Sequence, residues 1–266
     1  MNFKIPSTLL FCSLLLAGCS SQKSRKEVWK PLFNGKDLSG WTAKIYPYEV
    51  GNNYANTFRV KDGVIQVNYD GYGEKYEDRF GHLYYDVPYS DYHLKLEYRF
   101  YGELYPGAPD YTLRNSGVMF HSQDPRTMPA NQDWPISIEM QFLGGLSDGK
   151  ERPTGNMCSP GTHIYINGEL NTTHCINSTS KTYDGDQWVK AELIVRGDSI
   201  IKHIIQGDTV LTYSKPHIGG PVVNNYDPRI KIDGNKLKQG FIALQSEGQP
   251  VEFRNIYLKD LSKTTN

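Results

Sequence analysis

Short runs of alternating apolar and polar residues, separated by turn residues, constrain the fold of this chain most. The clearest run covers residues 92–100, where every second residue is Tyr, Leu or Phe. A period of two places successive side chains on opposite faces of a strand, so that one face packs into a core. Similar runs recur from residue 58 to residue 258, and Asp62-Gly63 and Gly207-Asp208 mark tight hairpins among them. With no long helical pattern between them, these runs predict an all-β sandwich.

The composition agrees with this fold class and argues against others. The chain has 266 residues, of which 38% are hydrophobic, enough for a packed core and too many for a disordered chain. It has 29 basic and 29 acidic residues, so no basic excess favours nucleic acid as a partner. Its 19 Tyr, 25 Gly and 15 Pro are typical of many strands joined by turns, and of the aromatic surfaces that bind sugars.

The N-terminus predicts an exported, lipid-anchored protein. An apolar run at residues 9–16 is too short to span a bilayer as a mature helix, and Leu-Ala-Gly-Cys19 follows it. This box resembles the cleavage site of bacterial lipoproteins, whose Cys is lipidated, although an ordinary secretory signal with a chance Cys is the alternative. We expect a signal peptide over residues 1–18, a flexible tether with lipidated Cys19 over residues 19–27, and one domain over residues 28–262.

This arrangement predicts a location in the cell envelope, anchored to the outer membrane. The segment after the lipidated residue is basic, running Ser-Ser-Gln-Lys-Ser-Arg-Lys from residue 20 to residue 26. Signals that direct lipoproteins to the cell surface resemble clusters of acidic residues at this place, so a position on the periplasmic face is favoured.

Two of the four cysteines fall within the expected domain. Cys158 and Cys175 form an even pair in an oxidising compartment, which favours a disulfide; the alternative is two free, buried thiols. Only His163 and His174 lie near them in the sequence, without the usual ligand spacing, which argues against a zinc site.

Two neighbouring strands carry an unusual set of polar residues on one face. The face opposite the apolar one has Asn115 and His121 in the first strand, and Glu139 and Gln141 in the second. These groups form hydrogen bonds and transfer protons. A strand face that only met water would not need them, because Lys, Thr and mixed charges would serve solubility equally well. Glu139 is therefore the candidate catalytic base and His121 the candidate acid. The alternative is a buried Glu–His pair that only fixes the strand register.

Other polar and aromatic residues are candidates for binding a substrate. Asn115, Gln141 and Gln245 can bind sugar hydroxyls or an enolate oxygen, or can equally be surface amides. Glu247 shares a face with Gln245 by the period of two and is a second-choice acid. Trp134 precedes a proline and either stacks on a sugar ring or packs within its loop.

His163 lies in the loop bounded by the two cysteines, where it either lines the same cleft or is simply solvated. The sequence requires no cofactor. A divalent metal held by Glu139, His121 and His163 would stabilise an enolate, but no spacing motif supports such a site. Trp41 and Trp188 are expected in the core.

Several stretches together resemble one known family, the 3-keto-disaccharide hydrolase domain. In order along the chain they read LFNGKDLSGW (32–41), NSGVMFH (115–121), SIEMQ (137–141), GFIALQSEG (240–248) and VEFRNI (251–256). The resemblance covers roughly residues 28–260. It implies a concanavalin A-like jelly roll made of two antiparallel sheets, with the site on one sheet face.

The resemblance also implies a substrate, a glycoside or disaccharide already oxidised to a ketone at C3, and hence an upstream sugar 3-dehydrogenase. A C3 ketone acidifies the C2 proton, so one base can remove it, the C1 aglycone can leave, and water can add back. This chemistry needs a base, a proton donor and groups that stabilise an enolate.

Ordinary retaining glycosidases on this fold resemble one another in a strand of alternating acids, and they need paired carboxylates. Here the strand that begins with Glu139 has Gln141 and Gly144 at the other two acid positions. The retaining mechanism is therefore disfavoured. The alternative function is a non-catalytic carbohydrate-binding module, since jelly rolls also serve lectins.

Overall fold

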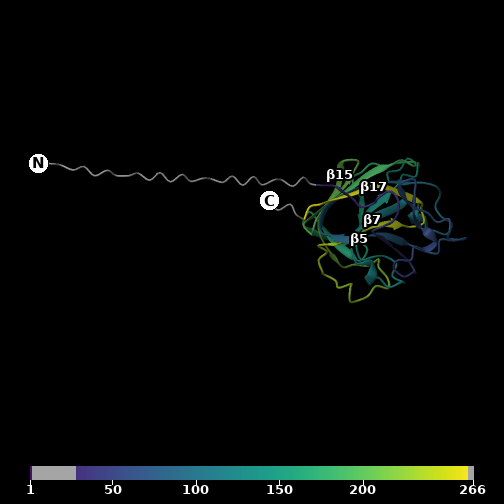
Figure 1. Ribbon diagram of the computed structural model, residues 1–266, viewed down its shortest axis with the longest axis horizontal. Helices are drawn as coiled ribbons and strands as arrows, with labels where there is room; N and C mark the ends of the chain where they lie inside the picture. The colour runs from purple at the N-terminus through teal and green to yellow at the C-terminus, as the bar shows by residue number, and fades with distance from the viewer. Residues whose placement is uncertain (2–27, 263–266) are drawn as a thin grey trace.

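The computed structural model describes Met1 and residues 28–262, which form two antiparallel sheets packed face to face (Figure 1). The predicted jelly-roll β-sandwich is confirmed. The described residues include three short 3-10 helices, η1 (Tyr54–Asn56), η2 (Asp110–Thr112) and η3 (Pro125–Thr127). No helix in this part of the chain is long and apolar enough to cross a membrane. The expected signal peptide, lipidated Cys19 and tether lie outside the described residues.

The larger sheet has ten strands within the described residues, and β1 (Lys30–Pro31) pairs with β17 beside the main order. That order is β11 (Glu169–Asn171), β10 (Thr162–Ile166), β15 (Asp208–Ile218), β14 (Ile200–Ile205), β13 (Val189–Arg196), β6 (Asp91–Phe100), β17 (Val251–Asp260), β4 (Val64–Val67) and β3 (Phe58–Lys61). The smaller sheet has seven, in the order β12 (Cys175–Ile176), β9 (Asn156–Cys158), β8 (Ile138–Leu143), β7 (Asn115–Ser122), β16 (Gly240–Ser246), β5 (Gly81–Tyr89) and β2 (Trp41–Ile45).

The core lies between the two sheets and takes alternate residues from each. Along β6, buried and half-exposed residues alternate over the whole strand, as the sequence predicts. Val118 and Phe120 of β7, and Ile138 and Met140 of β8, enter the same core from the smaller sheet. Because these positions point inward, Glu139 points to the outer face of the smaller sheet.

The segment from residue 144 to residue 183 contains the four short strands β9 to β12. The two cysteines are directly opposed in the pairing of β9 with β12, and the predicted Cys158–Cys175 disulfide is confirmed. β9 pairs with β8 and extends the smaller sheet beyond Glu139, whereas β10 and β11 join the larger sheet. The chain therefore crosses between the sheets here, and the disulfide closes the edge of the smaller one.

A β-bulge in β7 ends the strict alternation just before His121. The register between β7 and β16 shifts between Phe241 and Ala243, where β7 has one residue more than β16. His121 accordingly takes a φ of 46°, in the left-handed region. Gly240 faces this bulge so closely that a Cβ added to it would lie 2.6 Å from His121 Cα. Only glycine fits there, because the crowding atoms belong to the backbone.

We predict that Gly240→Ala destabilises the fold by about 1–3 kcal/mol, because the new methyl group has no side chain to displace. Urea unfolding at neutral pH measures this loss. Thr212→Ala, at an exposed position of β15, serves as the control and should stay within about 0.5 kcal/mol of the unaltered protein. Equal stabilities for the two variants would show that the bulge relaxes freely.

Candidate functional site

A pocket of about 300 Å³ opens on the outer face of the smaller sheet. The sheet and the residue following β16 supply Asn115, Glu139, Gln141, Cys158 and Glu247. The surrounding loops supply Tyr111, Trp134, Pro160, His174 and Val222. The structure thus gathers five of the residues that the sequence nominated for a site, from positions 115 to 247, around one cavity.

Glu139 lies at the centre of the sheet part of this pocket. It is opposed by Met119 of β7 and by Cys158 of β9, and it is only 6% exposed. Its carboxyl group lies over Gly117, where an added Cβ would be 2.5 Å from Oε1. The glycine on the neighbouring strand therefore makes the space that the carboxyl group occupies.

Glu247 is the second buried carboxyl group of the pocket, with 4% of the residue exposed. Gln245 Nε2 donates a hydrogen bond of 3.1 Å to Glu247 Oε1, and the Gln245 side chain also bonds to Glu139. Among the described residues, neither Glu247 Oε2 nor Gln245 Oε1 has a hydrogen-bond partner, although both atoms are buried. Gln245 thus connects the two acids and leaves polar atoms for a ligand.

Both carboxyl groups have pKa values above their usual range. Burial raises the pKa of Glu139, and the hydrogen bond from Gln245 opposes that rise. Burial raises the pKa of Glu247, and the nearby charge of Glu139 raises it further. Because two like charges in a buried site oppose each other, Glu139 loses its proton first, at its pKa of about 8, and Glu247 then keeps its own. One group is then a carboxylate and the other a carboxylic acid, as an acid–base pair requires.

Two amides of the predicted set also reach the pocket. Asn115 Nδ2 donates to the Tyr111 carbonyl at 3.3 Å, while the buried Asn115 Oδ1 has no partner among the described residues. Gln141 Oε1 accepts a hydrogen bond of 3.1 Å from Asn156 Nδ2, which fixes the direction of the Gln141 amide. Both amides are therefore held by the protein at one end, with further hydrogen-bonding capacity for a ligand.

Trp134 both packs and lines the pocket, so the two alternatives considered for it coexist. Its ring lies 5.0 Å from Phe80 and 5.5 Å from His82, centre to centre. Beneath it, buried Lys44 donates from Nζ to the Ala130 carbonyl at 2.9 Å. Burial lowers the pKa of Lys44 to about 8 and that of His82 to about 3, so the imidazole is neutral.

His121 does not lie with Glu139, which corrects the expected Glu–His pair. The bulge turns its side chain towards the larger sheet, where Nε2 lies 3.0 Å from the Gly197 carbonyl. His163 also lies outside the pocket, in β10, with its ring 5.8 Å from that of His217. The metal set of Glu139, His121 and His163 is therefore not brought together.

One other group of metal-binding residue types lines the pocket. The ligand atoms of Cys158, His174 and Cys175 lie within 4.8 Å of one another. The two sulfur atoms are bonded to each other, however, so neither is a thiolate that could bind a metal. In this structure the three residues line the pocket and do not form a metal site.

Four pocket residues, Tyr111, Pro160, His174 and Val222, were missed from the sequence because they lie in segments without any period. Partial burial and the nearby charge of Glu247 raise the pKa of Tyr111 to about 12. His174 has a buried Nδ1 without a partner in the described chain, and burial lowers its pKa. Val222 follows two glycines and a proline, a turn signal that predicts a loop but not its position.

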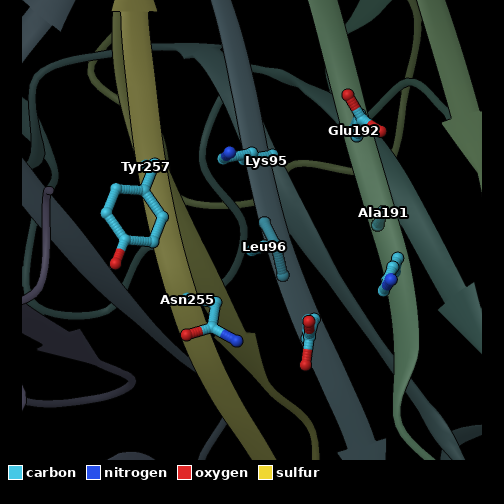
Figure 2. A pocket seen from close by; sticks show the side chains of 8 residues that line it. Lys95, Leu96, Ala191, Glu192, Asn255 and Tyr257 are labelled. Carbon is cyan, nitrogen blue, oxygen red and sulfur yellow. The ribbon is translucent and has the colours of Figure 1, made fainter. Parts of the chain in front are cut away.

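A second depression, of about 350 Å³, lies on the outer face of the larger sheet between β13, β6 and β17 (Figure 2). Four of its eight lining residues are charged, and two of these pair with residues beside it, Glu97 with Arg254 and Glu192 with His93, each at 2.7 Å. Beside it, Trp188 is half-buried and contacts the guanidinium groups of Arg254 and Arg99, which corrects its expected place in the core. These features are those of a solvated charged face, so the acidic pocket is the candidate site.

The fold and the pocket define a class, a jelly-roll domain with two buried carboxyl groups and several amides in a recess on one sheet. Sequence comparison then identifies the family within this class. The chain matches the family model of the 3-keto-alpha-glucoside-1,2-lyase-like domain over residues 28–259 and belongs to that family. The resemblance inferred from the sequence motifs is thereby confirmed.

Solved structures similar to this chain include two proteins from Parabacteroides distasonis, both provisionally described as glycosyl hydrolases. One is 18% identical, covers 88% of this chain and 100% of its own, and has a TM-score of 0.53. The other is 20% identical, covers 88% of this chain and 94% of its own, and has the same TM-score. At these identities the likeness shows the fold. The sequence matches none of the functionally curated proteins.

We predict that the free energy of unfolding falls as the pH rises from about 4.5 to about 8. The reason is that the unfolded chain releases the Glu139 proton at its ordinary pKa of 4.5, whereas the folded protein holds it up to a pKa of about 8. Glu247→Gln replaces a carboxyl group that the folded protein must keep protonated, so it should raise stability at pH 8 by roughly 1–3 kcal/mol. Urea unfolding between pH 5 and pH 8 measures both effects.

The matched control for this prediction is Glu252→Gln. Glu252 is equally buried, at 6% exposed, but pairs with Arg99 at 2.6 Å. Its replacement breaks an ion pair and should therefore lower stability across the same pH range. A Glu247→Gln variant that is less stable than the unaltered protein at pH 8 would show that the carboxyl pair serves the fold instead of opposing it.

We predict that removing the disulfide costs about 3 kcal/mol of stability, as expected for a closed loop of this length. The Cys158 and Cys175 bridge spans a sequence separation of 17 residues. Thermal unfolding of the double variant Cys158→Ala/Cys175→Ala tests this. Dithiothreitol should destabilise the unaltered protein and leave the variant unchanged; a loss in both would point to an effect unrelated to the bridge.

Proposed function

We propose that this protein cleaves 3-keto-glycosides, including 3-keto-disaccharides, by elimination across C1 and C2, followed by addition of water. The observation that carries this proposal is the pair of buried carboxyl groups, Glu139 and Glu247, which share one pocket and have raised pKa values. Membership of a lyase-like family for 3-keto-glucosides supports the same chemistry. Such an elimination requires one base and one acid near neutral pH.

In this proposal Glu139 is the base and Glu247 the acid. Gln245 bonds to Glu139 and so favours its charged form, whereas the charge of Glu139 favours the protonated form of Glu247. The Glu139 carboxylate removes the C2 proton, and the electron pair moves to the C3 oxygen as an enolate. The enolate then re-forms the ketone as the C1–O bond breaks, and Glu247 protonates the departing oxygen. The products are a free alcohol and a sugar with a C1=C2 double bond conjugated to the C3 ketone.

This step leaves Glu139 protonated and Glu247 ionised, which is the arrangement that hydration needs. Glu247 then takes a proton from water as its oxygen adds to C1, and Glu139 returns the proton to C2. The sum of the two steps is hydrolysis, and both acids recover their starting states. A pair that holds a single proton is therefore sufficient for the whole cycle.

The neutral amides around the pocket suit the enolate and the sugar hydroxyls. Asn115 and Gln141 are each held at one end by a protein hydrogen bond, so their orientation costs little on binding. Lys44 lies on the outer face of the smaller sheet, where it bonds to the Ala130 carbonyl without lining the cavity, and we assign it the role of holding the loop that bears Trp134. The earlier candidate acid, His121, has no role in this proposal.

We predict that the protein cleaves 3-keto-trehalose and leaves unoxidised trehalose intact, because only the ketone acidifies the C2 proton. Glu139→Gln and Glu247→Gln should each lower kcat by about 10²–10⁴. In D₂O the two variants should differ, since Glu247→Gln retains the base and exchanges the C2 proton for deuterium without cleavage. Glu139→Gln should show neither exchange nor cleavage. Mass spectrometry of the sugar distinguishes these results.

The control is Glu252→Gln, which removes an acid of the other sheet. It should retain the activity of the unaltered protein. Binding of 3-keto-trehalose without cleavage or exchange by the unaltered protein would contradict the enzyme proposal. It would instead support the alternative, a carbohydrate-binding module. Cleavage of unoxidised trehalose would contradict the elimination mechanism.

For the whole chain we propose a lipid-anchored protein of the cell envelope, supported by the Leu-Ala-Gly-Cys19 box. Its substrate must come from an enzyme class that oxidises the C3 hydroxyl of a glycoside, since elimination has no acidified C2 proton without that ketone. Labelling with radioactive palmitate, with Cys19→Ala as the comparison, tests the anchor.

A further inference from the structure

Part of the loop-built side of the pocket is apolar, in contrast to the acidic side on the sheet. Pro160, Val222 and Trp134 lie there beside the Cys158–Cys175 disulfide. Among the residues that line the pocket, Glu139 and Glu247 are the acidic ones, and no Lys or Arg is present. A sugar held with C1 and C2 at the two acids would direct the group attached to C1 away from them, towards the loops.

Val222 is in a conformation that a β-branched residue rarely adopts. Its φ is 70°, in the left-handed region, and 37% of the residue is exposed. A bulky branched side chain is strained at such a φ, and strain of this kind is retained only where the surrounding structure imposes it. Glycine would adopt the same backbone without strain, so the valine at this position calls for a reason beyond the turn itself.

The surrounding structure does impose this conformation. Asp133 Oδ1 accepts hydrogen bonds from the backbone N–H groups of Trp134, at 2.7 Å, and of Asn224, at 2.8 Å. Asp133 Oδ2 accepts a third, of 2.6 Å, from Asn224 Nδ2. One carboxylate thus fastens the loop that carries Trp134 to the loop that carries Val222.

A second set of contacts holds the same loop from below. The Gly161 N–H donates to the Pro221 carbonyl at 2.9 Å. Val223, only 6% exposed, packs with Ile136 and Ile218 in a small apolar cluster of its own. With Val223 turned into this cluster and Asn224 bound to Asp133, Val222 is left over the pocket.

We propose that Val222, with Trp134 and Pro160, forms a subsite for the leaving group of the substrate, and that it selects a leaving group with an uncharged, flat, apolar surface, such as an aryl group. This inference rests on the proposed function for the position of C1. The side chain adds a branched apolar wall at the point where glycine would relieve the strain. An anionic leaving group would have no cation to pair with and would meet the two acids.

The test compares two ligands that differ only in the leaving group, 4-nitrophenyl and methyl 3-keto-α-glucoside. Calorimetry measures their binding to Glu139→Gln, which does not consume them, and to Glu139→Gln/Val222→Gly. Loss of the valine should weaken binding of the aryl ligand roughly tenfold, the effect of leaving one such side chain out of the contact. Binding of the methyl ligand should change less than about twofold, since it does not reach the loop side.

The control is Gln206→Gly, made in the same background. Gln206 also has a positive φ, of 53°, but lies in the remote, exposed turn between β14 and β15. It should leave the binding of both ligands unchanged. Val222→Gly should unfold at the same urea concentration as the unaltered protein or at a higher one, because the substitution relieves strain.

Equal loss of both ligands in Val222→Gly, unchanged binding of the aryl ligand, or reduced stability of that variant would each overturn the subsite. The proposed function fails separately, by the absence of cleavage of either ligand in the protein that retains Glu139. In that event the binding measurements still decide whether Val222 contacts the aryl group.

Discussion

Two carboxyl groups held out of water, in one recess of a sheet, are the constraint on which the rest of the site depends. Burying one ionised carboxyl is costly, and burying two beside each other costs more, so the pair keeps a proton that water would remove. The fold supplies the conditions for this. Gly117 leaves room for Glu139, Gln245 connects the two acids, and the loops form the remaining walls of the recess.

The sandwich can sustain this cost because its core is formed elsewhere. Alternation sends Ile138 and Met140 into the space between the sheets and Glu139 to the opposite face, so the acid does not disturb the core packing. At its far edge the smaller sheet is fastened by the disulfide, whose Cys158 lies opposite Glu139. The same strands therefore pack the core with one face and carry the candidate catalytic residues on the other.

The strand faces could be predicted from the sequence, whereas contacts that depend on a bulge or a loop could not. Glu139, Gln141 and Glu247 reach the pocket, and Gln245 connects the two acids, because the period of two holds along β8 and along β16 into the residue that follows it. At His121 the same rule failed, since one extra residue in β7 reverses the side chain, and nothing within the strand's own pattern marks it. Gly240, on the neighbouring strand, is the only hint, and its meaning depends on knowing that the two strands pair.

Loop residues were beyond prediction for a different reason. Tyr111, His174 and Val222 come from three separate segments whose positions are set by distant partners, such as the Asp133 carboxylate that binds Asn224. The strained Val222 and the two buried acids are each locally unfavourable. A fold selected for stability alone would carry glycine in place of the valine and amides in place of the acids. That both departures occur around one cavity, while the core between the sheets follows the ordinary rules, is the physical reason to place the chemistry in this pocket.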